Sequence, residues 1–169
     1  NIEGVVGELM KKLGLGGFMG VHDVEKGMKI AVSFAGEEAE KKEYLPYIDY
    51  LKTDAAEAEI LTGLTDRAEA AKLLYSWGAK EIMITHNTEV LIYDGKEIYT
   101  CPIKARNLSG RTGRGDTTFA GYITERQRAD IPEALQYCTA LVSLKMETPG
   151  PFMGTREDVL DYIKEFYQN

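Results

Sequence analysis

Strand-like and helix-like segments alternate along this chain from Tyr44 onward, and this alternation restricts its fold more than any other feature. Short apolar runs indicate strands, and longer stretches with apolar residues at helical spacing indicate helices. The expected strands cover residues 47–51, 81–85, 89–93 and 97–101, and the expected helices cover 54–61, 67–77, 117–126, a stretch from Pro132 onward, and 155–167. This order predicts an α/β sandwich with a largely parallel sheet.

The first 43 residues show a less clear secondary-structure pattern than the rest. Residues 5–13 suggest a helix that the glycines of 14–17 interrupt, and residues 28–33 suggest a strand. Residues 37–43 are strongly charged and are interpreted as the solvated first part of a helix. We therefore separate a poorly assigned N-terminal segment, 1–43, from residues 44–169, where strands and helices can be assigned.

Composition and charge exclude several classes of function. The 169 residues are enough for one domain with a hydrophobic core. The net charge of −7 argues against a nucleic-acid or membrane-surface binder. No apolar run reaches the length of a membrane span, no signal peptide is visible, and two distant cysteines are typical of spare thiols in a reducing cytosol. We expect a cytoplasmic protein, and because residue 1 is not Met, a processed or trimmed piece.

A glycine-rich stretch at 109–121, S-G-R-T-G-R-G-D-T-T-F-A-G, carries the clearest chemical signal. It follows the pattern of a phosphate-binding loop, but Asp116 stands where that pattern has its lysine. Glycines let backbone amides approach an anion, and a following helix adds its positive end. A carboxylate there makes sense if it accepts the proton of a hydroxyl while the amides of 113–116 hold a phosphoryl group. The alternative is a simple turn with Asp116 as the helix N-cap, and the loop alone leaves both open.

The same stretch resembles the D-T-x-G-A-G-D-x-F signature of the ribokinase-like (PfkB) carbohydrate kinases. Matching positions are Gly113, Gly115, Asp116 and Phe119. The resemblance implies that Asp116 is the catalytic base and that the amides around Gly113, Arg114 and Gly115 form the anion hole.

Two positions of the loop depart from the family pattern. Gly110 replaces the family's first Asp, which puts the family's monovalent-cation site in question. Arg114 replaces a small Ala, and it either reaches phosphate oxygens or points to solvent or pairs with a surface carboxylate.

Three further segments resemble the family in order and spacing. Asp54 and Glu57, ahead of L-T-G at 61–63, match its N-x-x-E segment, which implies that Glu57 helps to place Mg²⁺ through water, with Asp54 in place of the asparagine. The alternative is that both are solvated acids at a helix start. Residues 82–95 resemble the strand–turn–strand beside the nucleotide, and residues 140–150 resemble the helix and turn that flank the adenine. The nucleotide-binding residues implied by the resemblance are Thr85, Asn87, Thr112 and Gly150.

The resemblance implies a ribokinase-like three-layer α/β/α sandwich that lacks the N-terminal part and the lid. It implies ATP-dependent, Mg²⁺-assisted phosphoryl transfer to a sugar or similar small alcohol. A nucleotide-binding regulatory module without turnover is the alternative. Because a half-kinase would expose a sheet edge, we also expect a homo-oligomer or completion by a missing N-terminal portion.

Overall fold

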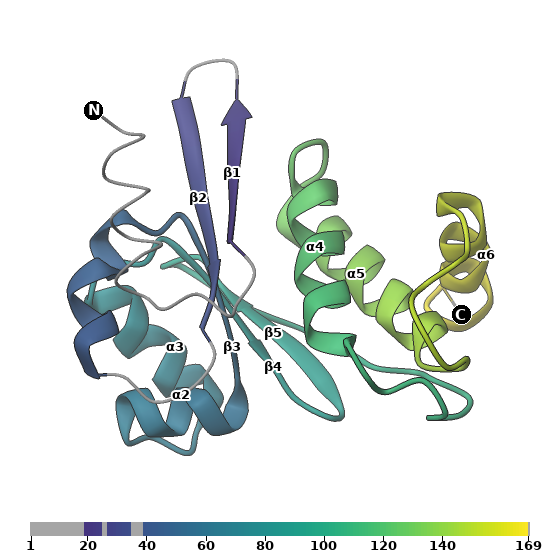
Figure 1. The fold of residues 1–169 in the computed structure, drawn as a ribbon, viewed down its shortest axis with the longest axis horizontal. Coiled ribbons are helices and arrows are strands. Elements are labelled where there is room, and N and C mark those ends of the chain that lie inside the picture. The colour runs from purple at the N-terminus through teal and green to yellow at the C-terminus, as the bar shows by residue number, and fades with distance from the viewer. Residues whose placement is uncertain (1–18, 25–26, 35–38, 169) are drawn as a thin grey trace. The chain divides into compact units, whose positions relative to one another are not determined.

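The computed structural model describes residues 19–24, 27–34 and 39–168, and the expected helix at 5–13 lies outside these residues. The described chain forms two compact units (Figure 1). The first unit contains residues up to Ile84 together with 93–97, and the second contains 85–92 together with everything from Ile98 onward.

In the described residues of the first unit, the elements in chain order are two strands, a 3₁₀ helix and a third strand. Their bounds are β1 Met19–Val24, β2 Gly27–Ser33, η1 Ala39–Tyr47 and β3 Tyr50–Asp54. β1 pairs antiparallel with β2, whereas β2 runs parallel to β3 with Ala31 opposite Tyr50. The sheet is therefore mixed. The charged helix expected from 37–43 is described from residue 39 as 3₁₀, and it contains Pro46, which lacks the N–H that an α-helix requires.

The remaining elements of the first unit follow the predicted order. They are α2 Ala55–Thr62, α3 Arg67–Ser76 and β4 Glu81–Thr85, whose last residue falls in the second unit. Asp54 caps the start of α2 and Gly63, with a φ of 74°, ends it. The glycine is needed there because a side chain disfavours this left-handed backbone. Within this unit the strands lie in chain order from β1 to β4.

The second unit contains two strands and three helices. They are β5 Glu89–Tyr93, whose last residue belongs to the first unit, β6 Ile98–Pro102, α4 Arg114–Arg126, α5 Ile131–Lys145 and α6 Arg156–Phe166. β5 and β6 are neighbours in the sheet.

The helices of the second unit pack closely on one another. Helices α4 and α5 lie side by side (Figure 1). A Cβ on Gly121 would lie 2.6 Å from Leu141 Cδ2, so the absence of a side chain allows this approach. Leu141 also belongs to a buried cluster between α5 and α6 that includes Val159 and Tyr162. This packing fixes the helix whose first turn contains Asp116.

Candidate active site

The glycine-rich loop enters α4 earlier than the sequence predicts. The helix begins at Arg114 rather than near Thr117, and Gly113 is its N-cap, with a φ of 77° in the left-handed region. Asp116 is therefore the third residue of the helix and not its cap. The reading of Asp116 as an ordinary N-cap is wrong, because glycine occupies that position and forms no side-chain cap.

Asp116 is left free by the fold. Its carboxylate is exposed, and within the part of the chain that the structure describes it makes no hydrogen bond or ion pair. The backbone N–H groups of Gly115 and Asp116 likewise have no acceptor among the described residues, because they belong to the first helical turn. A free carboxylate thus stands beside two free amide donors, which can hold an anion and accept a proton in one place.

Arg114 and Asn87, two of the predicted site residues, are in contact. The guanidinium Nη2 of Arg114 donates a hydrogen bond of 2.6 Å to the Asn87 side-chain oxygen. Asn87 lies in the exposed turn between β4 and β5, so this bond joins the predicted nucleotide turn to the glycine-rich loop. Arg114 is half-buried, and its carbonyl accepts a 2.7 Å bond from the Thr118 hydroxyl.

The base of the loop is held by the end of α5. The Gly110 amide donates to the Met146 carbonyl at 2.8 Å. The Lys145 ammonium donates to the carbonyls of Gly110, at 2.7 Å, and Thr112. Sequence reasoning missed Lys145, although one signal was available: it is the single charged residue in the mainly apolar helical stretch from Leu141 to Met146.

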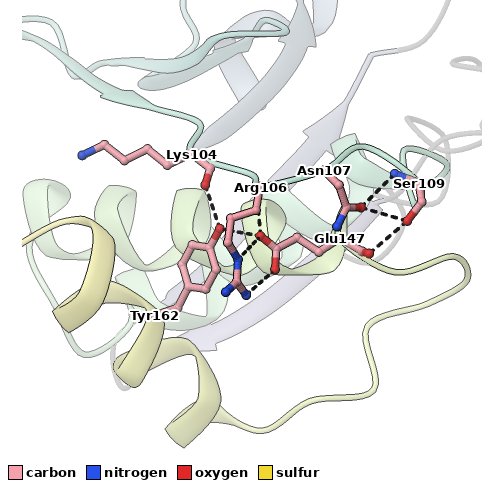
Figure 2. A network of polar contacts seen from close by, with 6 residues as sticks. All are labelled: Lys104, Arg106, Asn107, Ser109, Glu147 and Tyr162. Atoms are coloured by element: carbon pink, nitrogen blue, oxygen red, sulfur yellow. Dashed lines mark hydrogen bonds and ion pairs between the residues drawn. The ribbon is translucent and has the colours of Figure 1, made fainter.

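A polar network centred on Glu147 secures the segment that leads into the loop (Figure 2). Arg106 donates to the two carboxylate oxygens of Glu147 from Nε at 2.8 Å and Nη2 at 2.6 Å. The Tyr162 hydroxyl lies 3.0 Å from Glu147 and 2.7 Å from the Lys104 carbonyl. The Ser109 hydroxyl donates to the Glu147 carbonyl at 2.9 Å. Residues 104–109 are thereby tied to the end of α5 and to α6.

In this network the pKa of Glu147 is lowered and the pKa of Tyr162 is raised. The hydrogen bonds from Arg106 lower the pKa of the Glu147 carboxyl, outweighing the effect of burial. Burial and the nearby Glu147 raise the pKa of Tyr162, which stays a neutral hydroxyl. Glu147 is consequently a permanent anion at neutral pH, and its role is structural.

Asp54 and Glu57, the predicted metal residues, form a capping box in the first unit. Asp54 Oδ1 accepts from the Glu57 amide at 2.8 Å, and Glu57 Oε2 accepts from the Asp54 amide at 3.2 Å. Asp54 precedes α2 as its N-cap and Glu57 is the third residue of that helix, so both acids stand at the helix start. Glu57 Oε1 has no partner among the described residues, and this hard oxygen suits a water-held divalent cation. The described ranges contain no group of three or more potential metal-ligating side chains.

The remaining predicted nucleotide residues lie in the second unit at separate points. Thr85 is half-buried at the end of β4, and Thr112 is exposed, with its carbonyl bound by Lys145. Gly150 lies in an exposed turn with a φ of 86°. A cavity of about 490 Å³ is lined by residues on both sides of this turn, among them Thr148, Phe152 and Tyr162.

A turn with two free amide donors beside a free carboxylate, on an α/β framework, is an arrangement typical of phosphoryl-transfer sites. The match to known families agrees with this class, because residues 27–155 match the pfkB family carbohydrate kinase model. The chain belongs to the pfkB family of carbohydrate kinases.

Individual relatives agree with this assignment. A cytidine kinase of Thermococcus kodakarensis is 32% identical over 129 residues, which cover 69% of this chain and 45% of the relative. A solved pyrophosphate-dependent kinase in the ribokinase family, complexed with a pyrophosphate analog and myo-inositol, is 38% identical with a TM-score of 0.66, covering 76% of this chain and 45% of that one.

A ribokinase of Arabidopsis thaliana complexed with ribose and ATP is 22% identical and shows the fold alone. Its TM-score is 0.68, and the match covers 78% of this chain and 44% of that structure. The fold is therefore ribokinase-like, as predicted. The chain spans less than half the length of the relatives described here. None of the helices described is both long and apolar enough to cross a membrane.

Proposed function

We propose that the protein transfers a phosphoryl group from a phosphate donor to a hydroxyl of a sugar or similar small alcohol. The observation that carries this proposal is the free Asp116 carboxylate beside the free amides of the first turn of α4. The acceptor oxygen forms a bond to the terminal phosphorus of the donor, and the bond from that phosphorus to the leaving oxygen breaks. Asp116 accepts the hydroxyl proton, and the amides of Gly115 and Asp116 stabilise the transferring group.

ATP is the proposed donor, as the resemblance of the glycine-rich loop to the family signature implies. Pyrophosphate is a second candidate, because the neighbour at 38% identity is pyrophosphate-dependent. Bound Mg²⁺ would neutralise donor charge, and Glu57 Oε1 is the atom proposed to anchor its water shell. Myo-inositol and cytidine, which the relatives' names contain, define the acceptor classes to try first.

The test compares the wild type with Asp116→Asn on both donors, using polyols, sugars and nucleosides as acceptors. Loss of the base should lower acceptor-dependent turnover on the order of 10²–10⁴-fold while leaving donor affinity nearly unchanged. The matched control is Glu157→Gln, which changes an exposed acid in the first turn of α6. It should leave turnover and donor affinity at wild-type values. Wild-type turnover by Asp116→Asn would refute the assigned role, and donor binding without turnover in the wild type would favour the regulatory module.

A further inference from the structure

Lys145 is a buried cation that no carboxylate of the described chain neutralises. It is 2% exposed, and its ammonium donates to the carbonyls of Gly110 and Thr112. No ion pair is formed by Lys145 with any described residue. Burying a charge without an opposite charge is costly, so the fold keeps it at the expense of stability. A role in placing the loop explains why the cost is tolerated.

The two carbonyls that Lys145 binds lie directly before the anion-binding turn. Thr112 precedes Gly113, the N-cap of α4, and the free amides follow within the next three residues. Gly110 is pressed so closely to the end of α5 that an added Cβ would lie 1.8 Å from the Thr148 carbonyl oxygen. The ammonium therefore joins the last residue of α5 to both ends of the 110–112 segment.

Two neutral carbonyl oxygens hold this cation, and neutral carbonyl oxygens are also the ligands that proteins use for a bare monovalent ion. Lys145 is the last residue of α5, where the helix dipole favours a positive charge. The ammonium binds the carbonyls of Gly110 and Thr112 and not the free amides of Gly115 and Asp116, which are the proposed anion donors. It can therefore set the positions of the amides without contacting the phosphate.

We propose that Lys145 is a positioning residue that acts as a built-in monovalent cation, holding the 110–112 carbonyls so that the following amides form the anion site. The protein then needs no added potassium or ammonium ion to order this loop. The proposal rests on the proposed function for its kinetic test, but the ordering of the loop can be measured without turnover.

The first test uses Lys145→Met, which keeps an unbranched side chain one heavy atom shorter and removes its charge. We expect turnover to fall about 10–100-fold, because a displaced anion site is costly in rate, with a larger effect on kcat than on acceptor KM. Added K⁺ or NH₄⁺ should restore much of the loss, whereas tetramethylammonium at equal ionic strength should not. Lys164→Met, an exposed lysine in α6, is the control and should behave as the wild type. A variant as active as the wild type without these ions overturns the proposal.

The second test measures amide hydrogen exchange of residues 110–118 and does not depend on activity. Lys145→Met should exchange faster there, and K⁺ should restore protection in the variant while leaving the wild type unchanged. If no acceptor is turned over but this pattern holds, the proposed function fails and the positioning role stands. If Lys145→Met does not fold, Lys145→Arg keeps the charge and should remain independent of K⁺. Potassium dependence in that variant would overturn the proposal.

Discussion

In the glycine-rich loop, Arg114 stands at the position where the family signature has a small alanine. The structure directs its guanidinium to Asn87, so it is neither free in solvent nor committed to a carboxylate among the described residues. We expect Arg114→Ala to raise the KM of the phosphate donor about tenfold, since charge-assisted hydrogen bonds to phosphate are strong.

Asn87→Ala separates two explanations of that effect. If Arg114 only holds the turn between β4 and β5, both variants should show the same donor KM in steady-state kinetics. We expect the Arg114 variant to be more impaired, because it alone removes a cation. Equal defects would assign Arg114 a structural role.

Glu57 is predicted to act through its unused oxygen. Glu57→Gln should raise the Mg²⁺ concentration that gives half-maximal turnover, because a water-held cation loses an anionic anchor. Glu59→Gln, an exposed acid two residues along α2, is the control. A Mg²⁺ titration that is the same for both variants would leave Glu57 as a capping residue alone.

At the scale of elements, the junction of the loop with α5 depends on two glycines for different reasons. Gly110→Ala places a methyl group against backbone atoms of Thr148 and Lys145, which cannot move without shifting the end of α5. Gly113→Ala meets open space, and its cost comes from the left-handed backbone, about 1–2 kcal/mol. We expect the Gly110 variant to lose clearly more free energy of unfolding in urea titrations. Equal losses would show that the junction relaxes easily.

Because of the Glu147 network, the stability of the second unit should decrease at acidic pH. The folded pKa of Glu147 is lowered, so the folded state favours the anion, and this stabilisation is complete above the unfolded pKa of about 4.3. It is lost as pH falls below that value through the folded pKa. Glu147→Gln should be less stable than the wild type at pH 7, and this difference should shrink towards pH 3 in thermal melts. A constant difference would mean that Arg106 adds no charge-dependent stability.

The order of these elements was predictable from the sequence because its signals are local. The strands at 81–85 and 89–93 follow from apolar runs. The start of α4 was misplaced by three residues because glycines conceal where a helix begins. The role of Lys145 depends on contacts 33 and 35 residues away in sequence, which no local pattern contains.

At the scale of the molecule, the chain passes between the two units three times. Residues 93–97 belong to the first unit although 85–92 and the following strand belong to the second. Because β5 itself is divided between the units, we expect both to unfold in one cooperative transition.

Two built-in probes can measure this cooperativity. Trp77 is the chain's single tryptophan and lies in the first unit, whereas Cys138 is fully buried in the second, where burial raises the pKa of its thiol. In a Cys101→Ala background, tryptophan fluorescence and Cys138 labelling should give the same urea midpoint. Separate midpoints would show that the units unfold independently.

Because the chain crosses between the two units three times, recombination between related genes is also restricted. A single crossover after residue 84 would take 93–97 from one parent and the rest of the first unit from another. A hybrid would then have to complete the first unit with a foreign five-residue segment, which includes Gly95 fitted against Tyr75. For each unit to come from a single parent, recombination needs further breakpoints on both sides of residues 93–97. We therefore expect the two units to be inherited together.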